Sequence, residues 1–458
     1  VAIGKGANSV AGNTVLGESA LDAAVTGGTN VAIGNNSLTD LTSGAQNTAV
    51  GNTSLFELTT GSANTAVGQQ ALKSTTTASY NTAVGRAAMN DNTTGAQNTA
   101  VGQNALADNT TADNNTAVGY QSLRLNTTGT QNVAVGANAL DANTTADRNT
   151  AIGTSSLGTN STGANNTSVG YASLFNNTTA SNNTALGYNS LLSNTTGYSN
   201  TAVGANALDD ATTANGNTAV GKSALGATTT AGGNTAVGTD CLDQNTTGAN
   251  NTAIGRDALG VNTTGSENVA VGYLALDANT TASNNVGVGY NSLGANTTGT
   301  ENVAVGANAL DANTTADHNT AVGHNSITTN TTGSENTGIG QSSLRLNTTG
   351  ASNTAVGFAA LDQNTTASNN TACGENALGS TTTGANNTGI GRLALYANTT
   401  GTANTAVGAS ALDANTTGSY NLALGNSALT SNTTANSNTG VGYFTLSANT
   451  TGAHNTAL

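Results

Sequence analysis

An asparagine recurs every 17 residues along this chain, without a slip, from Asn13 to Asn455. A glycine follows each of these asparagines four residues later, from Gly17 to Gly442. With the asparagine as position one, the unit reads N-T-A-V-G-x-x-A-L-x-x-N-T-T-G/A-x-x. A fixed period of this kind means that each unit is one structural turn, which gains a core only by stacking on its neighbours.

The length and composition of the unit favour a β-structure. Helical repeats need about 33 to 47 residues and leucine-rich repeats at least about 20, while calcium-binding nonapeptide repeats carry an aspartate in each unit. Asparagine, threonine and glycine dominate here, and all three are weak helix formers. We therefore predict an all-β fold, a parallel β-solenoid (β-roll) of 17-residue coils.

Each coil is expected to contain two short strands and two tight turns. Thr-Ala-Val forms the first strand, x-x-Ala-Leu the second, and the glycine between them supplies a bend. Asn-Thr-Thr-Gly forms the return turn, in which the glycine at position fifteen can take a positive φ.

Stacking places identical residues above one another at about 4.8 Å. The leucines at position nine and the valines at position four are expected to become apolar ridges, and the asparagines to form amide ladders. Two large apolar residues per coil make a thin core, so a second burial surface is expected. Other copies of the chain around an axis would provide it most simply, as a homotrimer.

The repeat also sets the predicted domain organisation. Residues 1–12 are expected to form a shorter entry coil, and residues 13–458 a single elongated solenoid. The segment from Asn132 to Asp147 recurs unchanged from Asn302 to Asp317, which indicates duplication of whole coils. Because the chain starts and stops in mid-repeat, we expect it to be a fragment of a longer polypeptide.

The charge balance argues against two classes of partner. The chain has 9 Lys and Arg against 23 Asp and Glu, for a formal net charge of −14. Nucleic acids and anionic membrane surfaces are bound by clustered basic residues, which this chain lacks. No run of about 18 apolar residues predicts a membrane span. We therefore expect no nucleic-acid partner and no membrane contact within this segment.

No catalytic, cofactor-binding or metal site is predicted, and the chain is not expected to be an enzyme. Cys241 and Cys373 lie nearly eight coils apart, too far for an intrachain disulfide, and are interpreted as buried thiols replacing alanine and valine. His318, His324 and His454 are interpreted as solvated, because no ligand set recurs with them at metal-binding spacing.

Three further patterns are explained by the repeat itself. Aspartates often follow the leucine, as at Asp141, Asp209 and Asp311, but not in adjacent coils, which makes a calcium ladder a weak alternative. Gly338-Ile339-Gly340 lacks the helix and acidic residue of a nucleotide-binding loop. The many Asn-x-Thr sequences fit the N-glycosylation pattern, which has meaning only in a secreted eukaryotic protein.

Several motifs resemble known repeats. Asn-Val-Ala-Val-Gly at Asn132, Asn-Val-Ala-Ile-Gly at Asn30 and the start of the chain at Val1 resemble the head repeats of trimeric autotransporter adhesins. That resemblance implies left-handed parallel β-rolls that trimerise through the strand carrying the motif. The longer unit also resembles repeats of phage tail fibres, which often end in an intramolecular chaperone domain. The 17-residue unit is longer than the usual adhesin repeat, which leaves handedness and strand layout open.

These observations lead to one principal functional prediction. The chain is expected to be a structural fibre or adhesin segment that mediates attachment or acts as a spacer. It would lie outside the cell, at a cell surface or on a virion, with a cell-surface or glycan receptor as a possible partner. Two alternatives remain open: a self-assembling surface filament or layer subunit, and an ice-binding β-solenoid with threonine columns.

Overall fold

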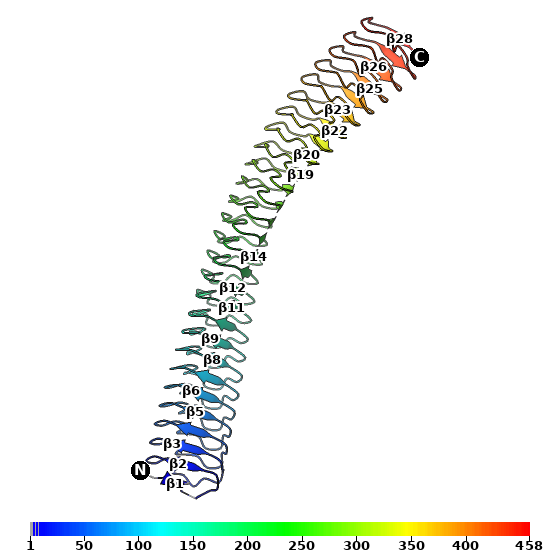
Figure 1. The fold of residues 1–458 in the computed structure, drawn as a ribbon. Coiled ribbons are helices and arrows are strands. Elements are labelled where there is room, and N and C mark those ends of the chain that lie inside the picture. The colour runs from blue at the N-terminus through cyan, green and yellow to red at the C-terminus, as the bar shows by residue number, and fades with distance from the viewer. Residues whose placement is uncertain (1–2, 5, 8) are drawn as a thin grey trace. The chain divides into compact units, whose positions relative to one another are not determined.

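The computed structural model describes residues 3–4, 6–7 and 9–458. The chain divides into two compact units, Val1–Gly232 (unit 1) and Gly233–Leu458 (unit 2). Short β-strands recur at 17-residue intervals in both units, and Figure 1 shows one strand in each successive coil. The repeat read from the sequence is therefore also the repeat of the backbone.

The strands of unit 1 are β1 Ile3–Gly4, β2 Thr14–Leu16, β3 Val31–Ile33, β4 Thr48–Val50, β5 Thr65–Val67, β6 Thr82–Val84, β7 Thr99–Val101, β8 Thr116–Val118, β9 Val133–Val135, β10 Thr150–Ile152, β11 Thr167–Val169, β12 Thr184–Leu186, β13 Thr201–Val203 and β14 Thr218–Val220. The strands of unit 2 are β15 Thr235–Val237, β16 Thr252–Ile254, β17 Val269–Val271, β18 Val286–Val288, β19 Val303–Val305, β20 Thr320–Val322, β21 Thr337–Ile339, β22 Thr354–Val356, β23 Thr371–Cys373, β24 Thr388–Ile390, β25 Thr405–Val407, β26 Leu422–Leu424, β27 Thr439–Val441 and β28 Thr456–Ala457.

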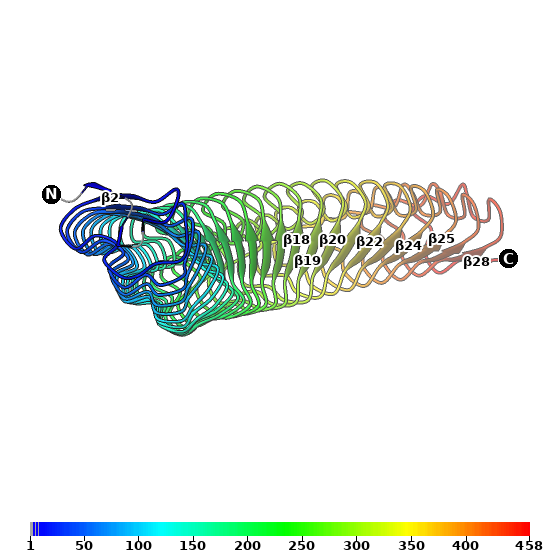
Figure 2. The same ribbon diagram turned by 90° about the horizontal axis from the view of Figure 1, so that it is seen from below.

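Neighbouring coils pair in parallel and in register. In β7 and β8, Ala100 lies opposite Ala117, the same position of the next coil. The backbone N–H of Thr99 donates to the carbonyl of Asn115 at 2.9 Å. Figure 2 shows the strands of unit 2 from β18 to β25 in one row. This arrangement confirms the predicted parallel β-solenoid of 17-residue coils.

The entry to unit 1 is paired differently from the coils that follow. The predicted entry coil over residues 1–12 lies partly outside the described residues. Within the described part, β1 pairs antiparallel with β2, with Gly4 opposite Val15. From β2 to β14 the pairing is parallel throughout.

Each described coil has one strand rather than two, so the prediction of a second strand at x-x-Ala-Leu was wrong. In the coil of residues 98–114, Asn104 at position seven and Leu106 at position nine have φ values of 56° and 52°. Two left-handed residues separated by a single residue turn the chain and cannot form a pleated strand. Position seven is often asparagine or serine, which favour turns; leucine at position nine is unusual in this conformation.

Positions five and fifteen of the repeat carry small residues because neighbouring coils approach each other closely there. Gly102, at position five, has a φ of 140°, and a Cβ there would lie 2.3 Å from the carbonyl oxygen of Gly119. Position fifteen does not take the predicted positive φ: Gly95 and its equivalents are outside the left-handed region in the described coils. A Cβ on Gly95 would lie 2.3 Å from the carbonyl oxygen of Ala112, so the backbone of this coil leaves no room there for a side chain.

The core confirms one predicted apolar ridge and contradicts the other. Leu106 is fully buried, as predicted for position nine, but Val101 at position four is 37% exposed and Ala100 at position three is fully buried. The interior has room for little more than a methyl group at position three. At Gly389, an added Cβ would lie 3.2 Å from Cγ of Leu378 and 3.1 Å from the carbonyl oxygen of Ala394.

Two columns of buried asparagine complete the core, which confirms the predicted amide ladders. At position one, the backbone N–H of Asn98 donates to Oδ1 of Asn81 at 2.9 Å. At position twelve, Nδ2 of Asn109 donates to Oδ1 of Asn92 at 2.7 Å. The carbonyl of Ala112 accepts from Nδ2 of Asn98 at 2.8 Å and from Nδ2 of Asn109 at 3.1 Å. Position fifteen thus joins the two ladders within each coil.

Candidate interaction surface

The outward side of the stacked strands is a regular surface of each unit, and one of its two rows of side chains is apolar. Because side chains alternate along a strand, position three points inward and positions two and four point outward. The burial pattern of strands such as β10 and β16 follows this alternation, with a buried central residue between two partly or fully exposed ones. We call the outward side chains of positions two and four the strand face.

The strand face carries no charged residue. Position two is threonine in most coils, and otherwise valine or, at one coil, leucine. Position four is valine, isoleucine or leucine in every coil but one, where it is Cys373. Three of its side chains are among the most exposed, with Leu186 at 46%, Leu424 at 44% and Ile152 at 40%. Large apolar side chains exposed in a continuous row are typical of interaction surfaces rather than of free surface.

The threonine-rich turn, in contrast, satisfies its own polar groups. The hydroxyl of Thr110, at position thirteen, donates to the carbonyl of Thr127 in the next coil at 3.1 Å. At position sixteen, a carboxylate oxygen of Asp113 accepts from the backbone N–H of Ala96 at 2.6 Å. These hydrogen bonds between successive coils stabilise the stacking of the coils.

The two cysteines have opposite environments. Cys241 replaces the small residue at position eight and is fully buried, and this burial raises the pKa of its thiol to about 12. Cys373 lies at position four and is exposed on the strand face. The interpretation of both as buried thiols was therefore wrong for Cys373, for the same reason that the valine column was misplaced.

Charged pairs that were not predicted from the sequence form between residues at the same repeat position of successive coils. Nε of Arg124 lies 3.1 Å from Oδ1 of Asp141, and both residues occupy position ten of successive coils. Nε2 of His318 lies 3.0 Å from Oε2 of Glu301, and both side chains are more than half exposed. A spacing of 17 residues would have revealed both pairs, because it puts residues in the same column.

Two aspartates at position ten are partly withdrawn from water. Burial raises the pKa of Asp277, and the nearby charge of Asp257 raises it further. Burial also raises the pKa of Asp311, and the hydrogen bond from Thr328 offsets part of this increase. Within the described part of the chain, no three His, Cys, Asp or Glu side chains are grouped as they would be around a metal ion.

Aromatic residues stack at position six, beside the strand face. The rings of Tyr171 and Tyr188 are nearly parallel, at 11°, with centroids 5.6 Å apart. In unit 2 the centroids of Tyr273 and Tyr290 are 5.9 Å apart, and the guanidinium of Arg256 lies 4.3 Å from the Tyr273 centroid. Such stacks follow from placing the same residue type in the same column of consecutive coils.

Among the described residues, no helix has the length and apolar character needed to cross a membrane. No protein-family model matches the chain, and no curated protein matches it. The functional argument therefore depends on the fold and on the surfaces described above.

Proposed function

We propose that this chain is a structural segment of an extracellular fibre or adhesin, whose copies associate as a homotrimer through the strand face. The observation that supports this proposal most directly is the uncharged, apolar strand face, repeated once per coil. Such a segment would act as a spacer or attachment element at a cell surface or on a virion. The motifs that resemble trimeric autotransporter adhesins and phage tail fibres support the same assignment and a trimeric state.

A second copy of the chain is the partner that best fits this surface. The apolar side chains of the strand face form a row with one residue per coil, about 4.8 Å apart. A partner can contact this row along its whole length only if its own side chains have the same spacing. Another copy has that spacing, and a symmetric assembly lets every copy use the same face. The absence of charge on the face means that copies would not repel one another there, despite the net charge of −14.

The size of the face is adequate for a stable interface. A strand of three residues at about 3.3 Å each, stacked at about 4.8 Å, offers a footprint of about 50 Å² per coil. A stable interface needs about 800 Å² per partner, which corresponds to about 16 coils. The described residues contain 26 three-residue strands, 13 in each unit (β2 to β14 and β15 to β27), so an interface of this size needs coils of both units. Association is thus expected to depend on the combined contribution of many coils.

Cys373 provides an experiment with the natural sequence. If copies associate in parallel and in register, Cys373 of one copy lies at the same height as Cys373 of another. Mild oxidation, or a short bis-maleimide, should then yield covalent dimers. The Cys373→Ser variant should give none, and the Cys241→Ser variant should behave like the natural chain because that thiol is buried.

The mass in solution completes this test. Light scattering should give three times the mass of one chain. A stable monomer at all concentrations would rule out the proposal. A trimer of the natural chain that gives no covalent dimers through Cys373 would instead place the interface on another face.

The threonines at position two support a second candidate, an ice-binding surface. The adjacent threonines of the return turn, such as Thr144 and Thr145, would face opposite ways along a strand and would not form a flat array. On the strand face, however, the residues at positions two and four point the same way, on either side of the buried residue at position three. They form two parallel rows along the stack of coils, as Thr150 and Ile152 do with their equivalents in the neighbouring coil. A thermal-hysteresis assay on the purified chain distinguishes the candidates, since a fibre segment should show no activity.

A further inference from the structure

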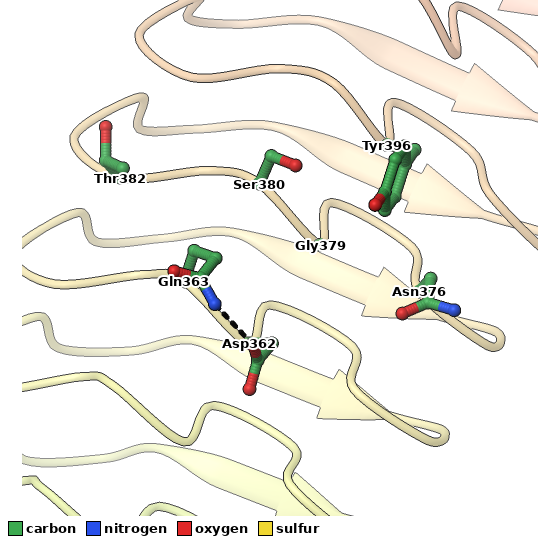
Figure 3. Close-up of a pocket in the computed structure, with 7 residues that line it drawn as sticks. All are labelled: Asp362, Gln363, Asn376, Gly379, Ser380, Thr382 and Tyr396. Atoms are coloured by element: carbon green, nitrogen blue, oxygen red, sulfur yellow. Dashed lines mark hydrogen bonds between the residues drawn. The ribbon is translucent and has the colours of Figure 1, made fainter.

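Unit 2 contains a pocket that the strand face does not include. It has a volume of about 440 Å³ and is lined by residues of three consecutive coils. Figure 3 shows its seven lining residues, which lie on the turn segments rather than on the outward side of a strand. A volume of this size is within the range of pockets that bind small molecules, about 300 to 1,000 Å³.

The pocket results from a glycine in the position-ten column. Asp362, Gly379 and Tyr396 occupy position ten of successive coils, and the missing side chain of Gly379 leaves a gap one coil high. The ring of Tyr396 lies over this glycine: a Cβ on Gly379 would be 3.2 Å from both Cδ2 and Cε2 of the ring. The ring therefore forms an apolar wall that is held against the backbone, while Tyr396 remains 43% exposed.

The charge on the opposite side of the gap is already neutralised. Asp362 accepts from Nε of Arg345 at 2.7 Å and from the terminal Nη2 at 3.0 Å. The side-chain amide of Gln363 also donates to Asp362, at 2.5 Å (Figure 3). The hydrogen bond to Asp362 raises the pKa of Arg345, so the guanidinium stays charged. The carboxylate is held in place and has little charge to offer a ligand.

Other polar groups at the pocket remain available. Within the described residues, the side chains of Asn376 and Ser380 make no hydrogen bond, although both line the pocket. The hydroxyl of Thr382 donates to the carbonyl of Thr399 at 3.1 Å, which leaves its oxygen free to accept. The pocket thus combines one aromatic wall with an amide that can donate and accept, and with two hydroxyls.

We propose that this pocket binds the ring of a neutral saccharide. A sugar ring has C–H groups that pack on an aromatic face and hydroxyls at its edge that both donate and accept hydrogen bonds. Tyr396 supplies the aromatic wall, and Asn376 and Ser380 supply the free polar partners. The Asp362–Arg345 pair makes the lining close to neutral, which matches an uncharged ligand.

The same lining disfavours other classes of ligand. A cation could pack on the face of the ring, but the carboxylate of Asp362 is occupied by Arg345 and offers it no second partner. A nucleotide could stack on tyrosine, but its phosphates would meet no free basic group, since Arg345 is paired and the chain carries a net charge of −14. A purely apolar ligand would leave the polar lining without hydrogen bonds.

This inference rests on the proposed attachment function and gives it a ligand class. The experiment is saturation-transfer NMR on the full chain with methyl galactoside, methyl glucoside and N-acetylglucosamine. At least one of these probes should bind saturably. The Tyr396→Ala variant should bind it at least about 10-fold more weakly, because the aromatic wall is lost.

Two matched controls separate the pocket from general effects. Tyr420→Ala removes another exposed tyrosine of unit 2 and should leave binding unchanged. Gly379→Val should fill the gap and abolish binding, whereas Gly260→Val, the same change at position ten of another coil, should not.

Each adverse result has a distinct meaning. Absence of binding by all three saccharides at tens of millimolar overturns the inference, as does equal binding by Tyr396→Ala. Binding of choline without any saccharide also overturns it and identifies a cation site. Cross-linking through Cys373 does not involve Tyr396, so failure of saccharide binding leaves the proposed assembly to be judged separately.

Discussion

At the scale of single residues, buried asparagine takes the place that large apolar side chains hold in most cores. An amide withdrawn from water is unfavourable unless it is hydrogen-bonded. Here the ladders supply partners from the same position in neighbouring coils, as between Asn109 and Asn92. A net gain of about 1 kcal/mol per hydrogen bond, repeated in every coil, makes stacking favourable where leucine alone would be insufficient. The ladder is therefore sensitive to any coil that lacks its asparagine.

Thr381 interrupts the position-twelve ladder and provides a test. Neither Oδ1 of Asn364 nor the hydroxyl of Thr381 has a hydrogen-bond partner in the described structure, and both are buried. The Thr381→Asn variant should restore a donor to Asn364 and stabilise the chain by about 1–2 kcal/mol. A higher denaturant midpoint for unfolding of unit 2 would be the expected result.

The converse substitution is the control for this prediction. Asn347 lies in the same ladder and donates to Oδ1 of Asn330 at 2.8 Å, while its own Oδ1 accepts from Asn364 at 2.7 Å. Asn347→Thr should lower the midpoint by a similar amount. If Thr381→Asn were destabilising, the ladder would not be a determinant of stability.

The aspartates of position ten predict an unusual response to acid. Burial raises the pKa of Asp277 and Asp311, so the charged form is disfavoured in the folded chain relative to the unfolded one. Each of the two charged carboxylates therefore lowers the stability of the folded chain at neutral pH. This loss of stability begins to disappear as the pH falls to the raised pKa of the folded chain, and it is gone below the ordinary pKa of about 3.9. Asp277→Asn should therefore be more stable than the natural chain at pH 7 and less distinct from it near pH 4. Denaturant unfolding at the two pH values measures this, and a difference that grew in acid would contradict it.

At the scale of the strand, the sequence predicted the element but not its orientation. The period, the strand at Thr-Ala-Val, the buried leucine and the amide ladders could all be predicted. The alternation of side chains left two choices for the strand, and hydrophobicity favoured burying valine rather than alanine. The structure buries Ala100 instead of Val101, because a side chain at position three touches the leucine of the preceding coil. That contact depends on the left-handed turn at position nine, which no local signal in the sequence indicates for leucine.

From the residues alone, without the resemblance to known repeats, the strand face was missed for the same reason. With valine assigned to the interior, the strand face could not be recognised as apolar. The saccharide pocket requires knowing that Gly379 and Tyr396 share a column and that the ring lies over the glycine. The 17-residue period shows that Gly379 and Tyr396 occupy the same position of successive coils. It does not show in which direction the ring of Tyr396 points.

Charge placed on the strand face tests its role. Ile152→Asp in unit 1 and Ile254→Asp in unit 2 introduce one carboxylate each at side chains that are 40% and 41% exposed. In a symmetric assembly, equal charges of all copies would meet, and the dissociation constant should rise at least about 10-fold. Sedimentation of the purified variants measures this, with circular dichroism to verify folding.

Position fourteen offers matched controls for this change. Thr145→Asp and Thr247→Asp add the same charges on exposed threonines away from the strand face. These variants should associate like the natural chain. Equal weakening by both pairs would indicate that net charge, rather than the strand face, governs association.

At the scale of the whole molecule, identical contacts recur between neighbouring coils within each unit. A coil is therefore interchangeable with its neighbours, and stability is approximately a sum over coils and their interfaces. The unchanged recurrence of Asn132 to Asp147 at Asn302 to Asp317 is consistent with such interchange. We therefore expect the fold to tolerate a change of length only in steps of a whole coil.

Deletion of one coil tests this property. A chain lacking residues 132–148 keeps the register and should retain cooperative unfolding with a modest loss of stability. A chain lacking residues 132–147 shifts every later residue by one, which turns inward side chains outward in the coils that must join. Limited proteolysis and circular dichroism should show local disruption only in the second variant. Equal behaviour of both would mean that the register is not enforced.

The direction of the hydrogen bonds between coils has a mechanical consequence. The bonds from Thr99 to Asn115 and from Asn109 to Asn92 run along the direction of stacking. A force that pulls on one end of a unit therefore breaks the bonds of one coil before it loads those of the next. Each released coil adds 17 residues of about 3.4 Å, or about 58 Å of extended chain, in exchange for about 4.8 Å of stack. A single chain would yield coil by coil and absorb energy over a long extension. Copies held together along the strand face would have to separate at the same time.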